Sequence, residues 1–231
     1  AISHTRRNRD HLQHAILANE DVIIRDVTSA YAVLALSGPL SRAVLETLVD
    51  ISLSAKDFPP YSLQQFYIGH APVFAQRLSF TGEMGWEIFI TPDFAEYVFE
   101  QLYQAGQAYD LRLAGGEALN ALRIEKGFVH WGSDMAYTES PHQIGLGFAC
   151  HVDKDIAFTG KAAYLARRAE AKGPFLCSLK LQQPDAMLHH NEPVLRDGVI
   201  VGFITSGAFS AAEGSAVALC LIEPPAGNSG D

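Results

Sequence analysis

Runs and alternations of hydrophobic residues predict a mostly antiparallel sheet in the first half of this chain. The expected strands are 22–28, 31–36, 66–68, 73–80 and 86–90. The run at 31–36 is apolar throughout, which is typical of a strand at the centre of a sheet. The strand at 86–90 alternates, so Glu87 and Phe89 should share one face. The opposite face of that strand should carry Trp86, Ile88 and Ile90.

Apolar residues spaced three and four apart predict helices between and after these strands. The expected helices are 11–19, 39–48, 91–102, 114–127 and the later part of 155–168. The third has the clearest start. Thr91 can cap it, Pro92 suits its first turn, and Asp93 lies near the positive end of its dipole.

From Phe175 onward the pattern predicts only strands, with an Asp197-Gly198 hairpin of type I′ between two of them. We therefore predict an α+β fold with a mixed, mostly antiparallel sheet and packed helices, followed by a small C-terminal β-barrel-like domain. The expected boundaries are 1–140 for the α+β region, 141–173 for a loop-helix connector and 174–231 for the barrel-like domain.

The composition narrows the class of protein. The 231 residues are 48% hydrophobic and 19% charged, which suits a folded chain with a substantial core. The formal net charge of −9 argues against a general surface for nucleic acid or anionic membrane. It leaves room for a local cationic pocket. No apolar run reaches the length that spans a membrane.

Cysteine and histidine positions predict no metal site. Cys150, Cys177 and Cys220 are widely spaced, so we expect buried free thiols in a reducing compartment. His189 and His190 are adjacent, and neighbouring residues rarely chelate one metal together. The remaining loop histidines, which could transfer protons but have no identifiable partner, are His130, His142 and His151.

The most informative segment for function is 80–87, Phe-Thr-Gly-Glu-Met-Gly-Trp-Glu. Its two glycines predict a hairpin-like turn over 81–85, because glycine adopts backbone angles that other residues avoid. Glu87 then begins a strand beside aromatic residues. Its carboxylate could accept two parallel hydrogen bonds from an N–H/NH₂ edge such as that of a pterin. The alternative is an ordinary solvated Glu on the wet face of a sheet.

Several short segments occur in an order that resembles the folate-binding aminomethyltransferase family, the glycine-cleavage T-protein group. The similarity is closest to the C-terminal region of dimethylglycine and sarcosine dehydrogenases. The matching segments are 26–28, 36–42, 80–87, 122–127, 131–134, 140–141, 145–147, 158–161 and 202–207. Glu125-Lys126-Gly127 and the later Trp131-Gly132-Ser133-Asp134 favour the dehydrogenase branch.

The resemblance implies a cloverleaf of α/β and barrel-like parts around a folate cavity, here incomplete, and tetrahydrofolate as cofactor. It makes Glu87 the acid that holds the pterin, and Phe80 and Trp131 further cofactor-binding residues. The family commonly has Tyr at the position of Phe80, so the stacking face is kept and the hydroxyl is lost. T-proteins have an Arg where this chain has Leu119, which leaves the cation for the glutamate tail unidentified.

The resemblance also implies what the chain does. A flavin domain with FAD, in the same or a partner polypeptide, would oxidise an N-methyl amine to an iminium. The region seen here would transfer the one-carbon unit to tetrahydrofolate. The family's catalytic Asp precedes the segment resembling 22–42, so no catalytic residue is assigned and we expect no turnover by this chain alone. The expected compartment is the cytoplasm, or the mitochondrial matrix in a eukaryote.

Two other interpretations stay open at this stage. The chain could be a non-catalytic folate-binding or structural module of the same fold. It could also be an α+β domain with an unrelated role.

Overall fold

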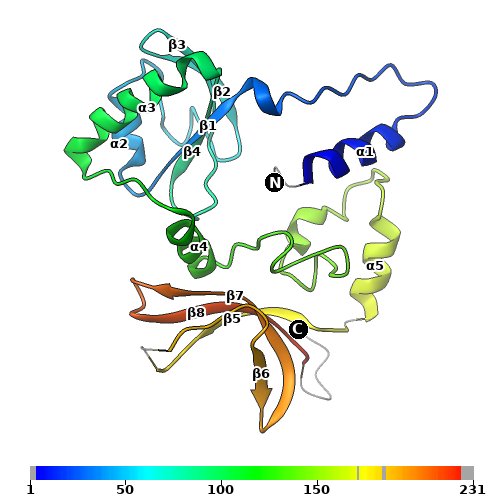
Figure 1. The fold of residues 1–231 in the computed structure, drawn as a ribbon. Helices are drawn as coiled ribbons and strands as arrows, with labels where there is room; N and C mark the ends of the chain where they lie inside the picture. The colour runs from blue at the N-terminus through cyan, green and yellow to red at the C-terminus, as the bar shows by residue number, and fades with distance from the viewer. Residues whose placement is uncertain (1–3, 171, 184–185, 225–231) are drawn as a thin grey trace. The chain divides into compact units, whose positions relative to one another are not determined.

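The computed structural model describes residues 4–170, 172–183 and 186–224. The chain forms two compact units, Ala1–Leu113 and Ala114–Asp231, and each contains an antiparallel sheet of four strands (Figure 1). The α+β class with antiparallel sheets is therefore confirmed. The two units are defined by which residues pack together. The expected boundaries at 140 and 173 instead separate a folate-binding region, a connector and a barrel-like domain, and they stay a prediction. Residues 225–231, the end of the expected barrel-like domain, lie outside the described residues.

Over residues 4–113, the described part of the first unit, the chain forms one sheet and three α-helices. Its sheet has the order β1-β4-β3-β2, with neighbouring strands antiparallel. The elements in chain order are α1 (Thr5–Ala15), a 3₁₀ turn (Thr28–Ala30), β1 (Ala32–Ser37), α2 (Ser41–Glu46), β2 (Leu63–Ile68), β3 (Ala71–Gln76), β4 (Gly85–Ile90), α3 (Pro92–Gly106) and a second 3₁₀ turn (Gln107–Tyr109).

One face of this sheet forms the core of the first unit. The alternation expected in β4 is confirmed, because Trp86, Ile88 and Ile90 are fully buried while Glu87 and Phe89 lie on the other face. Val98 and Leu102 of α3 pack into the same core. Each apolar side chain of this size contributes about 1.5–3 kcal/mol when fully buried. This packing fixes which face of β4 carries Glu87.

The second unit contains a sheet of order β5-β8-β7-β6. Its elements are α4 (Gly116–Glu125), a 3₁₀ turn (Gly147–Cys150), α5 (Lys161–Glu170), β5 (Phe175–Lys180), β6 (Pro193–Arg196), β7 (Val199–Ser210) and β8 (Ser215–Ile222). Six successive residues of β8 are buried, since α4 covers one face of the sheet and apolar side chains cover the other. The hairpin at Asp197-Gly198 is confirmed, with both residues at positive φ as a type I′ turn requires.

Three of the expected strands differ from the structure. The strand expected at 73–80 ends at Gln76, as β3. Residues 22–28 form no strand, and Val22 and Ile23 are exposed without a partner strand. The Asp26 carboxylate instead accepts hydrogen bonds from the backbone N–H and hydroxyl of Thr28, at 3.0 and 2.7 Å, and bends the chain there. The run at 31–36 does form β1, but this strand lies at the edge of the sheet and Val33 is half exposed.

Two helix starts also differ from the prediction. α1 runs from Thr5 to Ala15 and ends because Ile16 is extended. α2 begins at Ser41, two residues after Pro39.

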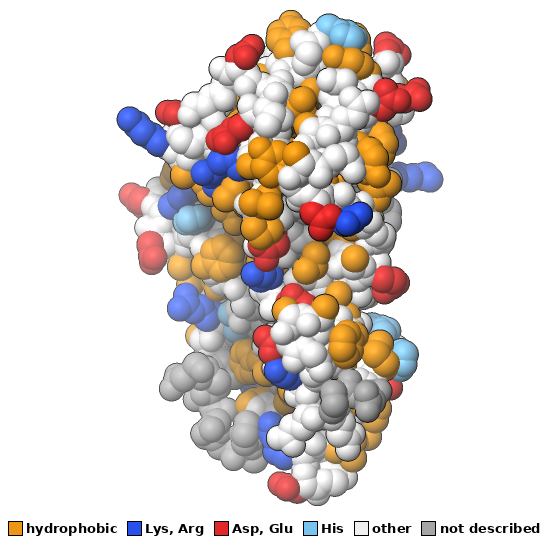
Figure 2. Space-filling view, turned by 90° about the vertical axis from the view of Figure 1, so that its left-hand side faces the viewer, with side chains coloured by type: hydrophobic (Ala, Val, Ile, Leu, Met, Phe, Trp, Pro, Cys, Tyr) orange, Lys and Arg blue, Asp and Glu red, His pale blue; other side chains and the backbone are white. Residues whose placement is uncertain are grey.

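One face of the molecule shows no concentration of a single sign of charge. On the face drawn in Figure 2, Lys and Arg side chains lie singly among acidic, polar and hydrophobic ones. Among the described residues, none of the helices combines the length and the apolar character that crossing a membrane would require.

Candidate functional site

Glu87 occupies a defined position near the start of β4. Its in-register neighbours are Ala35 on β1 and Gln76 on β3. The residue is partly buried, and it lies on the sheet face opposite to the core. The packing of Trp86 and Ile88 into the core therefore directs the intervening carboxylate to the second face.

That second face carries apolar and aromatic side chains next to the in-register neighbours of Glu87. Phe89 follows Glu87 by two residues and is in register with Val33 and Phe74. The ring of Phe74 meets that of Tyr31 edge-on, with centroids 6.1 Å apart. Val33 is 49% exposed, so helices do not seal this face as they seal the core face. A partly exposed carboxylate beside open aromatic faces can bind a flat heterocycle that carries hydrogen-bond donors.

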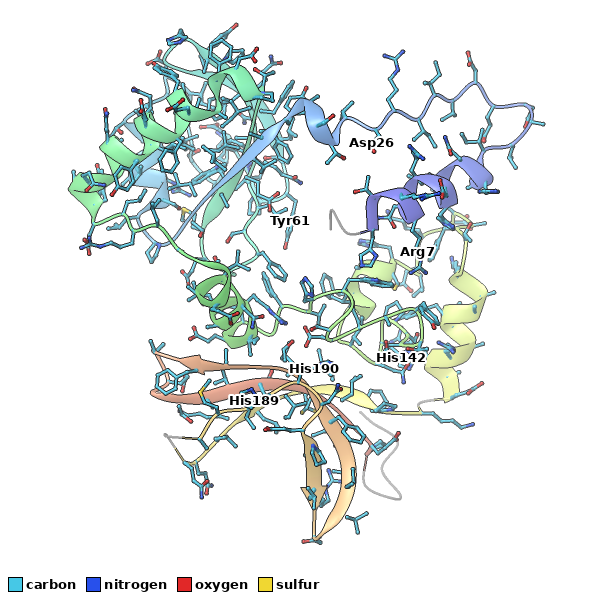
Figure 3. All side chains as sticks on the ribbon, in the orientation of Figure 1. Arg7, Asp26, Tyr61, His142, His189 and His190 are labelled. Atoms are coloured by element: carbon cyan, nitrogen blue, oxygen red, sulfur yellow. The ribbon has the colours of Figure 1, made fainter. Side chains whose placement is uncertain are left out.

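A hollow of about 910 Å³ adjoins this face within the first unit. It is lined by Thr5, Asn8, Arg9, Leu12, Ile24, Arg25, Asp26, Val27, Thr28, Tyr31, Val33, Leu63, Phe74 and Phe89. Glu87 is outside this lining, although its strand neighbour Phe89 belongs to it. Figure 3 shows Asp26 on the segment that joins α1 to β1. The hollow thus combines an apolar floor from the sheet with a polar wall from residues 5–28.

Charged groups in the polar wall have distinct environments. Hydrogen bonds from the side chain and then the backbone of Thr28 lower the pKa of Asp26, so its carboxylate is ionised at neutral pH. Arg9 forms a long ion pair with Asp10, at 3.8 Å, through Nη2. The Arg9 Nε–H is buried and has no hydrogen-bond partner among the described residues. A buried donor of this kind is a candidate contact for an anionic group.

Phe80 lies in the connection between β3 and β4. Ser79 Oγ and Thr81 Oγ1 are 2.6 Å apart, and the Thr81 N–H donates to Ser79 Oγ at 3.2 Å. Gly82 then takes a φ of +74°, as expected for a turn over 81–85. These bonds on either side of Phe80 hold a partly buried ring in the same unit as Glu87.

Trp131 lies in the second unit, on the loop that follows α4. Its side chain is 36% exposed, and residues 131 and 135 form an isolated backbone bridge. The structure thus places Glu87 and Phe80 in one unit and Trp131 in the other.

A buried ion pair beneath the Trp131 loop was missed by the sequence reasoning. Arg123 of α4 pairs with Asp134, and their side chains are 3% and 0% exposed. Both residues belong to segments that carry the family resemblance, 122–127 and 131–134. The opposite charges of Arg123 and Asp134 could have suggested an ion pair, although nothing in the sequence showed that the two side chains meet.

His142 is partly buried in the second unit. Its Nδ1 lies 2.9 Å from Ser140 Oγ, and its Nε2 is buried with no partner among the described residues. Burial, and then the charges of Arg167 and Arg168, lower the pKa of its imidazole. Figure 3 shows His142 beside α5, where it lines a second hollow of about 320 Å³ that also includes Arg167.

The adjacent histidines have separate hydrogen-bond partners. His190 Nδ1 lies 2.7 Å from the carbonyl oxygen of Thr205, and the His189 N–H donates to the Glu192 carboxylate at 3.2 Å. Within the part of the chain that the structure describes, no three His, Cys, Asp or Glu side chains gather as metal ligands would.

Comparison with known proteins identifies the family. Residues 1–154 match the GCVT N-terminal domain, and residues 175–231 match the glycine cleavage T-protein C-terminal barrel domain. These two matches cover most of the chain, and it therefore belongs to the glycine cleavage T-protein family.

The similar proteins include an oxidase, a dehydrogenase and an aminomethyltransferase. The chain is 36% identical over 208 residues to 4-methylaminobutanoate oxidase (formaldehyde-forming) of Paenarthrobacter nicotinovorans, covering 89% of this chain and 25% of that protein. It is 36% identical over 196 residues to mitochondrial dimethylglycine dehydrogenase of Rattus norvegicus, covering 85% and 23%. It is 33% identical over 193 residues to the aminomethyltransferase of Halothermothrix orenii, covering 84% and 53%. The chain thus spans about a quarter of the length of the first two relatives and about half of the third.

A solved structure shows the same fold. The glycine cleavage system aminomethyltransferase T of Bartonella henselae superposes with a TM-score of 0.76 at 23% identity, over 95% of this chain and 58% of that one. The predicted T-protein-like fold is therefore confirmed.

Proposed function

We propose that this chain is a tetrahydrofolate-binding region that takes part in transferring a one-carbon unit from an N-methyl amine to tetrahydrofolate. The observation that carries the proposal is the Glu87 carboxylate, partly exposed on an aromatic sheet face in a T-protein-family chain. The relatives named as an amine oxidase, a dehydrogenase and an aminomethyltransferase support the same chemistry.

The residues present suit a folate. A hollow of about 910 Å³ is in the size range of small-molecule sites. Its aromatic floor suits a pterin or a benzoyl ring. The Arg9 Nε–H has no partner within the described part of the chain. Together with Arg25, it offers positive charge for the glutamate carboxylates, the role left open by Leu119.

In this proposal each residue has a binding role. Glu87 accepts hydrogen bonds from the pterin N–H/NH₂ edge and orients the ring. Phe80 contributes an aromatic face. Trp131, which belongs to the second unit, is proposed separately as a residue that stacks on a flat ring. When bound, tetrahydrofolate supplies the nucleophilic nitrogen for the one-carbon unit. The protein holds and orients that nitrogen, and FAD belongs to a flavin-bearing part outside residues 1–231. The free cysteines favour a reducing compartment, the cytoplasm or the mitochondrial matrix.

Calorimetric titration of tetrahydrofolate under argon tests the binding proposal. p-Aminobenzoylglutamate is the matched control ligand, because it keeps the tail and lacks the pterin. We expect saturable binding of tetrahydrofolate and much weaker binding of the control. No binding, or equal binding of both ligands, would contradict recognition of the pterin.

A transfer assay separates the leading proposal from its alternative. The alternative is a non-catalytic folate-binding or structural module of the same fold. The full-length protein that contains this region is supplied with an N-methyl amine and tetrahydrofolate, and methylenetetrahydrofolate is measured. The leading proposal expects product above the spontaneous rate. The alternative expects binding with no such product.

A further inference from the structure

Asp134 is a buried carboxylate that three parts of the second unit hold. It accepts hydrogen bonds from the Arg123 guanidinium of α4, from the Thr205 hydroxyl of β7 at 2.6 Å, and from the backbone N–H of His130 at 2.8 Å. The side chain is fully buried, and these three donors come from a helix, a strand and its own loop. The carboxylate therefore ties the loop to both neighbouring elements.

Arg123 anchors the start of the same loop. Its Nη1 also donates to the carbonyl oxygen of Phe128 at 3.0 Å, and its Nη2 donates to Ser206 Oγ at 2.6 Å. Its Nε donates to the side-chain oxygen of Asn120 at 2.9 Å. The planar guanidinium makes these bonds at once because its donors form a rigid fork, which a Lys ammonium lacks.

Local bonds then fix the path of residues 130–135. The backbone N–H of Asp134 donates to the His130 carbonyl at 2.9 Å, and that of Gly132 donates to the Met135 carbonyl at 2.8 Å. Gly132 has a φ of +93°, which a residue with a side chain rarely adopts. The loop is thus set around Trp131, whose indole stays 36% exposed.

Stability alone is a weak reason for such a network. Burying an ion pair costs desolvation free energy, which the attraction between the charges often does not offset. Proteins in which apolar residues of similar volume replace such a pair are frequently as stable as the parent. What an apolar substitute cannot reproduce is the directional grip on the His130 N–H and on Phe128. The network therefore fits a role in setting the geometry of the loop.

We propose that Asp134 is a positioning residue, which through Arg123 and the His130 N–H holds the loop so that Trp131 is placed to stack on a flat heterocyclic ligand. This inference rests on the proposed folate function, and it adds to that function a buried group that never touches the ligand. Thr205 belongs to the same hydrogen-bond network, because its hydroxyl donates to the second carboxylate oxygen of Asp134.

Tryptophan fluorescence tests the positioning directly. The chain has two tryptophans, and Trp86 is fully buried in the first unit. Trp86→Phe leaves Trp131 as the sole reporter and removes an indole N–H that has no hydrogen-bond partner among the described residues. In this background, Asp134→Asn keeps the side-chain volume but leaves one acceptor oxygen and turns an NH₂ group toward donors. We expect red-shifted emission from Trp131 and stronger quenching by acrylamide.

Tetrahydrofolate affinity, measured in chains that keep Trp86, is the second readout. We expect Asp134→Asn to weaken binding about tenfold, because the contact residue is misplaced rather than removed. Asp153→Asn is the matched control, since Asp153 is exposed in the same unit, and it should change neither readout. Circular dichroism confirms folding of each variant.

A second variant keeps the inference open to contradiction if Asp134→Asn does not fold. Thr205→Val removes one of the three hydrogen bonds without adding charge, and it should move both readouts in the same direction by a smaller amount. A folded variant that is less stable, with unchanged Trp131 emission, would overturn the proposal. If the parent chain binds tetrahydrofolate, a variant with changed Trp131 emission but unchanged affinity would overturn the proposal as well. A parent chain that does not bind tetrahydrofolate defeats the proposed function, and the emission arm then still decides whether Asp134 positions Trp131.

Discussion

The Trp86 indole meets the Phe58 ring edge-on in the core of the first unit, with ring centroids 6.2 Å apart and an interplanar angle of 63°. Both side chains are fully buried. Trp86 directly precedes Glu87 on β4, so this contact on the core face fixes the strand that presents the carboxylate on the other face. Core packing and ligand binding are thus coupled through one pair of adjacent residues.

Phe58→Ala should therefore destabilise the first unit by about 3–5 kcal/mol, because a cavity replaces a fully buried ring. Urea denaturation followed by Trp86 fluorescence, in a Trp131→Phe background, measures the change. Tyr61→Ala is the control, since Tyr61 is 80% exposed and its loss should be nearly neutral. A loss for Phe58→Ala as small as for Tyr61→Ala would contradict the packing described.

The Cys220 thiol should make the free energy of unfolding depend on pH in the alkaline range. Burial, and then the neighbouring Cys177, raise the pKa of its thiol from an ordinary value of 9.0 to about 11. The folded state therefore binds more protons than the unfolded state between these values. The contribution is fully present below pH 9 and is lost as the pH rises through 11. We expect the free energy of unfolding to fall by up to about 2–3 kcal/mol over this range.

Denaturation at pH 8 and pH 11 measures this effect, and Cys220→Ala should reduce the difference. Alkylation gives a second check. Cys177 is exposed, contrary to the expectation of buried thiols, so a maleimide at pH 8 should modify Cys177 well before Cys220. Equal labelling in the folded chain would contradict the burial of Cys220.

His142 should give the opposite dependence at acidic pH. Its pKa is lowered by burial and by Arg167 and Arg168, so the folded state binds fewer protons than the unfolded state below the ordinary value. Its contribution to stability is present above pH 6.5 and is lost as the pH falls through the lowered pKa. Arg167→Gln should raise the pKa of His142, as measured by NMR titration of the imidazole carbon-bound protons. Arg196→Gln, on the exposed hairpin of the same unit, should leave it unchanged.

The sequence predicted what depends on neighbours along the chain. The two faces of 86–90, the turn after Phe80 and the hairpin at Asp197-Gly198 follow from local spacing and from the conformational freedom of glycine. Long-range pairing was less accessible. The run at 31–36 looks like a central strand, yet only the fold decides that β4 is its one neighbour in the described sheet.

The same limit explains what was missed at the candidate site. Arg123 reaches Asp134 across 11 residues and Ser206 across 83, distances at which spacing carries no information. Residues 22–28 have the composition of a strand, but a strand needs a partner for its backbone, and the Asp26–Thr28 turn competes with extension there. Positions of single residues were therefore more predictable than the contacts between them.

The candidate pterin contacts can be ranked by the kind of interaction each would make. A carboxylate at position 87 can accept both hydrogen bonds from the pterin N–H/NH₂ edge. Glu87→Gln keeps one acceptor and turns an NH₂ donor toward a donor, so we expect a loss of about 2–3 kcal/mol in tetrahydrofolate binding. Phe80→Leu removes an aromatic face but keeps apolar bulk, so we expect about 0.5–1.5 kcal/mol.

Calorimetric titration of both variants beside the parent chain measures this ranking, with circular dichroism to confirm folding. Glu96→Gln is the matched control. It removes the same charge from the exposed surface of α3, the helix that packs on the opposite face of the sheet, and it should leave the affinity unchanged. If Glu87→Gln costs no more than Phe80→Leu, or no more than Glu96→Gln, the carboxylate does not hold the pterin. The assignment of Glu87 must then be abandoned even if the chain binds tetrahydrofolate, because the affinity would have to come from the aromatic and cationic groups of the hollow.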